Sequence, residues 1–178
     1  DKIVIDDRQG AYVATKRLID QGRTKIALIT TQDYLSVSKA RTEGYLKAIA
    51  DSNLTLDEDW ILKMPSMGMD EKLFTGFLDN ADIDAVLCVN EIFAIAAMRY
   101  LKQKGKSIPE DVAFIGFTDG LLSKYANPSL TAIAQHGDEM GKMAADMLIE
   151  KIESEQEEET YVTKIIEPTL IERDSTIN

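Results

Sequence analysis

A short apolar run, Val112 to Gly116, is followed at once by Phe117 and then by the polar pair Thr118 and Asp119. Apolar residues at successive positions over this length are typical of a strand that is covered on both faces. In open α/β sheets, ligands bind just outside the carboxyl ends of such strands. The segment therefore predicts a buried parallel strand that delivers polar side chains to a cleft.

Strand-like and helix-like segments alternate along the rest of the chain. Predicted strands cover residues 3–5, 25–30, 59–63, 85–89 and 112–116, and predicted helices cover residues 10–21, 37–52, 69–78, 91–104 and 138–152. Residues 161–166 and 169–171 are candidates for terminal strands. This alternation favours a mostly parallel sheet with helices on both faces. The predicted fold class is therefore α/β, as a Rossmann-like three-layer unit.

The length of 178 residues fits one domain, or one domain with a fragment of another. The 20 basic and 31 acidic side chains give a formal net charge of −11. A chain this acidic is not expected to bind DNA or an anionic membrane by itself. No apolar run approaches the ~18 residues of a membrane span. Because the sequence opens at Asp1 and leads directly into a strand, we expect it to be part of a longer polypeptide.

Catalytic chemistry is difficult to build from these residues. His136 is the only histidine and Cys88 the only cysteine, which leaves no Cys/His cluster for zinc and no convincing nucleophile–base pair. Cys88 is expected to be a buried strand thiol, and His136 a solvated or capping residue. No glycine-rich phosphate loop is present. The sequence therefore predicts no cofactor, no metal site and no enzymatic activity.

Asp6 and Asp7, at the end of the first predicted strand, resemble the acidic pair with which response-regulator receivers bind Mg²⁺. A receiver also needs a phospho-accepting aspartate at the next central strand end, where this chain has Asn90. The receiver interpretation fails at that position. One of the two aspartates is instead expected to cap the helix that follows.

The polar residues at the other strand ends have the composition of a small-ligand cleft. Arg41 can bridge two hydroxyls or a carboxylate of a ligand, or it can be a surface arginine. Asn90 suits a sugar hydroxyl, or it caps the helix that begins at Glu91. Thr118 and Asp119 can grip a polyol or form a capped turn. Spacing alone leaves these alternatives open.

Five segments in a fixed order resemble the LacI/GalR family of transcription regulators. They are residues 10–29, the element Arg41-Thr-Glu-Gly-Tyr45, residues 89–98, the turn Gly116-Phe-Thr-Asp119, and residues 128–135. The resemblance covers nearly the whole chain, and the order is more specific than any one motif. It implies a type I periplasmic-binding-protein-like fold, in which an effector binds between two subdomains.

The resemblance also implies which residues face the effector. They are Arg41, Asn90, Phe117, Thr118, Asp119 and Gln135. The sequence departs from the family pattern at two positions. The family has an acid directly after the aromatic residue, where this chain has Thr118, so the carboxylate grip would shift to Asp119 or be absent. The acid after Asn90 is Glu91, a milder change.

A division of the chain follows from the same resemblance. Residues 1–135 would form the C-terminal effector-binding subdomain, residues 136–159 a helix and acidic loop that pack on a missing N-terminal subdomain, and residues 160–178 terminal strands that return to the C-terminal subdomain. The DNA-binding headpiece and most of the N-terminal subdomain would lie outside this chain. The apolar stripe of the helix 138–152 would then lack a cover, and we expect a second copy to supply it by exchange of this helix.

The expected function is binding of a small effector, a sugar or related polar metabolite, within a cytoplasmic, homodimeric repressor. Contact with DNA would pass only through the headpiece absent from this chain, and no membrane contact is expected. The helical segment 93–101 is a candidate dimer surface, unless the sheet buries it. The alternatives are a periplasmic sugar-binding protein of a transport system and, on fold grounds alone, an enzyme on a doubly wound sheet.

Overall fold

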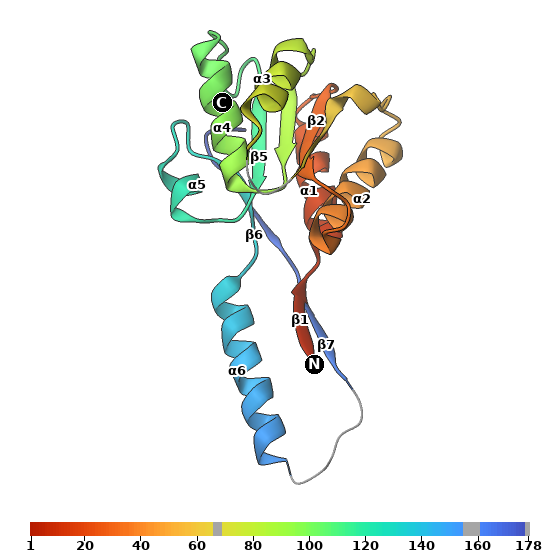
Figure 1. Ribbon diagram of the computed structural model, residues 1–178, viewed down its shortest axis with the longest axis vertical. Helices are drawn as coiled ribbons and strands as arrows, with labels where there is room; N and C mark the ends of the chain where they lie inside the picture. Colours follow the sequence, from red (N-terminus) through yellow and green to blue (C-terminus); the bar gives the residue numbers. More distant parts are fainter. Residues whose placement is uncertain (66–68, 155–160, 177–178) are drawn as a thin grey trace.

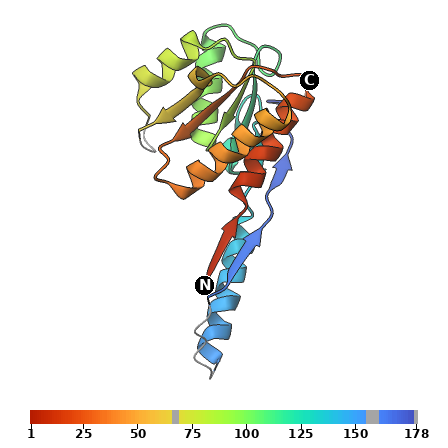
Figure 2. The same cartoon turned by 90° about the vertical axis from the view of Figure 1, so that its right-hand side faces the viewer.

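The computed structural model describes residues 1–65, 69–154 and 161–176, so most of the acidic loop predicted within 136–159 lies outside the described residues. The molecule has two parts (Figure 1). The upper part is a core built around a large sheet, and the lower part holds α6 (Gly137–Glu153) beside the strands β1 (Lys2–Ile5) and β7 (Thr163–Ile166). Figure 2 shows the lower part as a narrow extension of the core.

The core sheet has six strands in the order β3-β2-β4-β5-β6-β8. They are β2 (Ile26–Thr31), β3 (Ile61–Met64), β4 (Ala85–Cys88), β5 (Ala113–Phe117), β6 (Thr131–Ala134) and β8 (Thr169–Ile171). The first five strands in this order run parallel, and β8 pairs with β6 antiparallel. Every residue of β2, β4, β5 and β6 is buried. The predicted α/β class with a mostly parallel sheet is confirmed.

Helices cover both faces of this sheet and complete the three layers. Figures 1 and 2 show α1 (Asp7–Asp20) and α2 (Ser36–Asp51) together on one face, and α3 (Glu71–Asn80) and α4 (Glu91–Gln103) on the other. The first two helices approach each other closely at Gly44. A Cβ at this position would overlap the carbonyl oxygen of Arg8 and lie 2.9 Å from the Cβ of Ala11. Glycine is therefore required for this helix packing.

The direction of winding reverses between β2 and β4. From β2 the chain passes through α2 to β3 on one side, and it returns through α3 to β4 on the other side of β2. Doubly wound sheets bind ligands at such a switch point, outside the carboxyl ends of the strands. The segments that follow β2 and β4 are therefore the expected surroundings of a ligand.

Two elements are not revealed by the sequence pattern. Residues 131–134 are absent from the predicted strands, yet they form β6, which lies inside the sheet between β5 and β8. The helix α5 (Leu121–Tyr125) follows β5 and has only five residues. The predicted strand 59–63 is also displaced, because Glu58–Trp60 forms a 3-10 turn and the strand β3 begins at Ile61.

The two terminal strands join different sheets. Strand β7 pairs with β1 in a parallel two-stranded sheet, with Lys2 opposite Thr163 and Ile5 opposite Ile166, whereas β8 belongs to the core sheet. The chain passes three times between the two parts, after β1, after β6 and after β7. The first and third passages are joined by a hydrogen bond, which the Asp6 N–H donates to the Ile166 carbonyl at 3.0 Å.

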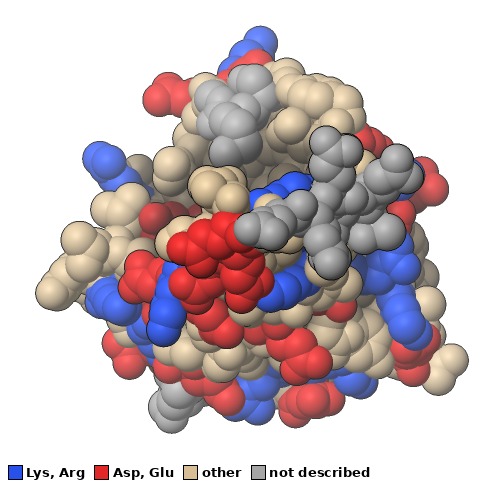
Figure 3. Space-filling model, turned by 90° about the horizontal axis from the view of Figure 1, so that it is seen from below, with Lys and Arg blue, Asp and Glu red and all other residues tan. Residues whose placement is uncertain are grey.

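The helix α6 has no buried residue, and Leu148, Ile149 and Ile152 are more than half exposed. Seen from below, a group of acidic side chains lies near the middle of the lower face, with basic side chains around it (Figure 3). None of the helices among the described residues has the length and apolar character needed to cross a membrane.

Candidate ligand-binding site

The side chains singled out in the sequence gather at the carboxyl edge of the core sheet. Asn90 follows β4, Thr118 and Asp119 follow β5, and Gln135 follows β6. Arg41 reaches the same edge from α2, which follows β2. The parallel arrangement of β2, β4, β5 and β6 brings these strand ends together, at and beside the switch point.

Arg41 is buried, with 6% of its surface exposed, and it is fully engaged on several sides. Its Nε donates to Asp7 Oδ1 at 2.7 Å, its Nη1 donates to the Val89 carbonyl, and its guanidinium carbon lies 3.8 Å from the centre of the Phe117 ring. A surface arginine, one of the two open alternatives, is therefore excluded. The guanidinium joins α1, the end of β4 and the end of β5 at one point.

Asp7 is the partner that the sequence did not identify. The helix cap expected from the acidic pair is Asp6, whose Oδ1 accepts from the Gln9 N–H at 2.9 Å, while Asp7 forms an ion pair with Arg41 at 2.6 Å. Burial raises the pKa of the Asp7 carboxyl above its ordinary value, although the neighbouring guanidinium acts in the opposite direction. Burial likewise lowers the pKa of Arg41, which remains charged.

Asn90 is the N-cap of α4. Its Oδ1 accepts a hydrogen bond from the Phe93 N–H at 2.8 Å, as the capping alternative predicted. This bond uses the amide oxygen and fixes the orientation of the side chain. The amide nitrogen takes no part in the cap, so it is still a donor for a ligand.

Thr118 has a backbone φ of 84°, in the left-handed region that a β-branched residue rarely adopts. Its Oγ1 donates to Gln135 Oε1 at 3.0 Å, and its N–H donates to the Ile133 carbonyl at 3.0 Å. The structure thus brings two of the predicted ligand residues into direct contact. A strained backbone at a binding edge is typical of functional turns.

Asp119 is turned into an ion pair with Arg173, which sequence analysis also missed. The same guanidinium donates through Nη1 to the Leu130 carbonyl at 2.8 Å. Lys124 Nζ lies 3.9 Å from the other carboxylate oxygen of Asp119. The carboxylate therefore holds the turn after β5 in place, and its charge is balanced within the protein.

A cavity of about 530 Å³ lies beside this edge. Its walls come from the turn after β5, the end of β6 and the first residues of α6: Thr118, Asp119, Lys124, Ala134, Gln135, His136, Gly137, Asp138 and Glu139. Three predicted ligand residues line it, whereas Arg41, Asn90 and Phe117 lie deeper at the neighbouring strand ends. The cavity therefore extends from the core toward the lower part of the molecule.

The groups at this edge are suited to hydrogen bonding. They comprise a buried guanidinium, two carboxamides and a hydroxyl, while the carboxylates of Asp7 and Asp119 are paired with arginines. His136 lies 2.8 Å from the Thr169 hydroxyl through its Nε2. Within the described part of the chain, no three His, Cys, Asp or Glu side chains are grouped so that they could hold a metal ion. The arrangement favours recognition of a polar ligand, and Lys124, Asp138 and Glu139 add charged groups to the cavity wall.

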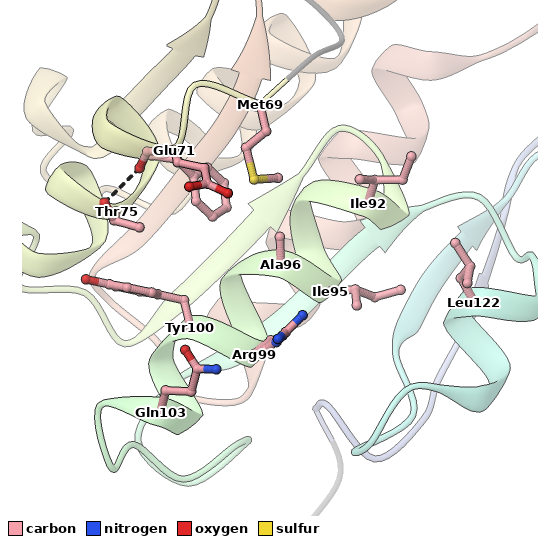
Figure 4. A pocket seen from close by; sticks show the side chains of 11 residues that line it. Met69, Glu71, Thr75, Ile92, Ile95, Ala96, Arg99, Tyr100, Gln103 and Leu122 are labelled. Atoms are coloured by element: carbon pink, nitrogen blue, oxygen red, sulfur yellow. Dashed lines mark hydrogen bonds between the residues drawn. The ribbon is translucent and has the colours of Figure 1, made fainter.

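A second surface lies on the opposite side of α4 from the sheet. A cavity of about 500 Å³ is lined mainly by α3, α4 and α5, and Figure 4 shows Ile92, Ile95 and Leu122 around one side of it. Ile92 and Leu122, which line it, are 56% and 55% exposed, and Leu121 and Tyr125 of α5 are 70% and 82% exposed. We call these four residues and the cavity the α4–α5 surface. The apolar stripe expected there within 93–101 mostly faces the sheet instead, because Phe93, Ala94, Ala97, Met98 and Leu101 are buried.

Comparison with known proteins places this geometry in context. The sequence model of the periplasmic binding protein-like domain family matches residues 15–176 of this chain. The chain is 35% identical over 184 residues to the HTH-type transcriptional repressor PurR of Aliivibrio fischeri, with 100% of this chain and 53% of that protein covered. It is 33% identical over 181 residues to the ribose operon repressor of Haemophilus influenzae, with 98% and 53% covered. The chain thus spans about half the length of the curated relatives it matches.

Two solved structures that share this fold are transcriptional regulators. The complex of the regulator CelR with cellobiose superposes with a TM-score of 0.88 at 31% identity, covering 97% of this chain and 53% of that one. A LacI family regulator from Enterococcus faecium with bound ribose gives a TM-score of 0.84 at 28% identity, covering 98% and 65%. Both of these structures contain a sugar.

Proposed function

This chain belongs to the periplasmic binding protein-like family, and on that premise we propose that it is the effector-binding part of a LacI-type transcriptional regulator. One observation supports this most directly: at the switch point of a doubly wound sheet, Asn90, Thr118 and Gln135 present hydrogen-bonding groups from three different segments, while the buried Arg41 joins the neighbouring strand ends. The relatives are repressors, which favours a regulator over a transport protein.

The proposed ligand is a neutral, hydroxyl-rich molecule, with a sugar as the first candidate. Carboxamides and a hydroxyl form directional hydrogen bonds with the hydroxyl groups of such a ligand. Phe117 is fully buried against the Arg41 guanidinium, so its ring supports the site from within. The carboxylates at this edge are paired with arginines, and Thr118 stands where the LacI/GalR pattern has an acid. The carboxylates of Asp7 and Asp119 are therefore engaged within the protein, and the carboxylates of the cavity wall outside these pairs are those of Asp138 and Glu139. The cellobiose and ribose in the two similar regulator structures belong to this class of neutral, hydroxyl-rich ligands.

Regulation would follow from closure of two subdomains around the ligand. We assign residues 1–135 to the C-terminal subdomain, and residues 136–159 to a segment that packs on an N-terminal subdomain outside this chain. Residues 160–178 are assigned to the terminal strands that lead the chain back to the C-terminal subdomain. The exposure of α6 supports the assignment of residues 136–159. The strands β1 and β7 form a separate sheet in the lower part, so they are exceptions to the bounds 1–135 and 160–178. Ligand binding shifts the equilibrium toward the closed arrangement, and this closure changes the position of a DNA-binding headpiece.

Two copies are proposed to associate through the α4–α5 surface. Leu121 and Tyr125 are exposed on α5, and Leu122 of the same helix lines the cavity, so one copy offers both exposed apolar side chains and a hollow. A two-fold interface needs this kind of self-complementary patch. Contact with DNA is assigned to a headpiece outside this chain, since the chain carries a net charge of −11. A regulator of this kind works in the cytoplasm and acts by binding rather than by catalysis.

Isothermal titration of the full-length protein tests the ligand site. The titrants are cellobiose, ribose and a set of neutral monosaccharides and disaccharides. Asn90→Asp keeps the oxygen that caps α4 but removes the amide donor, so affinity should fall about tenfold, the equivalent of one hydrogen bond. Asn53→Asp makes the same chemical change on an exposed residue after α2 and should leave affinity unchanged. Equal affinity of the Asn90→Asp variant would exclude this site, and binding of no sugar would exclude the ligand class.

A further inference from the structure

The short helix α5 is attached to the candidate ligand site by a fully buried serine. Ser123 has no exposed surface. Its hydroxyl lies 2.9 Å from the Thr118 carbonyl oxygen and also 2.9 Å from Glu91 Oε2. Its N–H donates to the same Glu91 oxygen at 3.2 Å. Ser123 therefore contacts both the strained turn after β5 and the first residue of α4.

The Ser123 hydroxyl has one proton and two acceptors at equal distance. A serine can donate only one hydrogen bond at full strength. When the proton points to the Thr118 carbonyl, α5 is bound to the turn of the ligand site. When it points to Glu91, α5 is bound to α4 through both the hydroxyl and the backbone N–H. The hydroxyl can therefore strengthen the contact with the turn or the contact with α4, while the Ser123 N–H remains bonded to Glu91 in both cases.

Both acceptors adjoin residues of the candidate site. Thr118 is one of those residues, and its side chain is bonded to Gln135. Glu91 directly follows Asn90, the cap of α4. The Glu91 carboxylate also lies against Gly120, where an added Cβ would be 2.9 Å from each of its oxygens. The close approach of Glu91 therefore depends on the absence of a side chain at Gly120.

The opposite side of α5 is exposed and apolar. Leu121 and Tyr125, which flank Ser123 in this helix, are 70% and 82% exposed and belong to the α4–α5 surface. A change in how Ser123 is held would move these side chains together with the helix, because five residues form little more than one turn. The same small helix therefore carries the buried contact with the site and the outer contact with a partner.

We propose that the Glu91–Ser123 contact couples the ligand site to the α4–α5 surface, so that occupancy of the site and association of two copies are energetically linked. The inference rests on the ligand site and the dimer proposed above, and it adds a route between them. Coupling of this kind is reciprocal: a change at the site alters the dimer dissociation constant, and dimer formation alters the affinity of the site. Ser123 acts as a positioning residue, since it reaches the site only through Thr118 and Glu91.

A double-mutant cycle on the full-length protein tests the coupling without the need for a known ligand. Gln135→Ala removes the side-chain partner of Thr118, and Ser123→Ala removes the hydroxyl. Sedimentation measures the dimer dissociation constant of the wild type, the two single variants and the double variant. Gln135→Ala should raise this constant about fivefold or more when Ser123 is present, at the lower end of typical coupling energies. In the Ser123→Ala background the same change should alter it less than about twofold.

Thr169→Val is the matched control, because it breaks the contact with His136 at the same edge of the molecule without touching the Ser123 cluster. It should leave the dissociation constant unchanged. A dimer that is insensitive to Gln135→Ala, or equally sensitive with and without Ser123, would overturn the coupling and leave the dimer intact. A monomeric wild type would overturn the dimer, and the coupling with it.

Hydrogen exchange provides the second measurement if Ser123→Ala does not fold. In the protein with Ser123 intact, Gln135→Ala should accelerate exchange of the Ser123 amide about fivefold or more, since this N–H is held by Glu91. An unchanged exchange rate would contradict the proposal.

Discussion

Single side chains at the ligand edge are held by partners that lie far away in the sequence. Arg41 and Asp7 are 34 positions apart, and Arg173 and Asp119 are 54 positions apart. In both pairs the guanidinium also donates to a backbone carbonyl, of Val89 or Leu130. Each arginine therefore ties a carboxylate to a strand end. Arg41 is the buried member of the first pair, so removal of Asp7 would leave its charge buried without compensation.

Asp7→Asn tests the first pair. The Arg41 guanidinium would remain buried without its counter-charge, so the free energy of unfolding should fall by about 3 kcal/mol. Asp6→Asn is the control next to it, because asparagine caps a helix as well as aspartate does, and its effect should stay within about 0.5 kcal/mol. Urea unfolding followed by circular dichroism measures both. Equal effects of the two substitutions would mean that the pair with Arg41 contributes nothing specific.

Backbone strain at Thr118 can be tested by comparing two variants that both lose the same side-chain contact. Thr118→Ala and Thr118→Gly both remove the hydroxyl that donates to Gln135, but only glycine adopts a positive φ without strain. The glycine variant should therefore be more stable than the alanine variant by about 1 kcal/mol. Thermal or urea unfolding measures the difference. If alanine were the more stable, residue 118 would not have the left-handed conformation.

The sequence predicts the edge at which these residues meet, but it does not predict their pairings. The positions after the strands follow from the apolar runs and from the order of the five family-like segments. Asp7 carries no signal that separates it from Asp6, and Arg173 lies in a terminal segment without a motif of its own. Which carboxylate meets which guanidinium depends on how α1, α2 and the last strand pack. That packing is a property of the folded chain.

Among the helices and strands, the long helices are predicted from the sequence, whereas two short elements, one strand and one helix, are not. The longer elements, such as α1, α2 and α4, are predicted to within a few residues, because their periodicity extends over several turns. Strand β6 has four residues, three of them polar or small, and α5 has five. Segments this short show no periodicity. The conformation of β6 is fixed by pairing with β5 and β8, and that of α5 by the contact with Glu91.

Gly44→Ala tests the contact between α1 and α2. The added methyl group would overlap the Arg8 carbonyl oxygen and crowd Ala11, so the two helices must separate. The free energy of unfolding should fall by about 3 kcal/mol, the upper part of the range for overpacking. Gly76→Ala is the control within α3, since no atom lies within 4 Å of an added Cβ there. That substitution should raise stability by about 0.5–1 kcal/mol, and denaturant unfolding distinguishes the two signs.

The whole molecule has two apolar surfaces that its own described residues do not cover. One is the α4–α5 surface on the core, and the other is the face of α6 that includes Leu148 and Ile152. Surfaces of this kind mark contacts with other chains or with further parts of the same chain. The chain spans about half the length of its curated relatives. Under the function proposed above, the α6 face would pack against an N-terminal subdomain outside this chain, and the α4–α5 surface against a second copy.

This assignment predicts different outcomes for matched substitutions in the full-length protein. Leu121→Ser with Tyr125→Ser removes two exposed apolar side chains from each copy, so the dimer dissociation constant should rise at least about a hundredfold with little change in monomer stability. Leu148→Ser with Ile152→Ser should instead lower the free energy of unfolding by about 3 kcal/mol and leave the dissociation constant unchanged. Sedimentation and urea unfolding separate the two effects. If the α6 substitutions dissociated the dimer and the α5 substitutions did not, the copies would associate by exchange of α6, and the α4–α5 surface would need another partner.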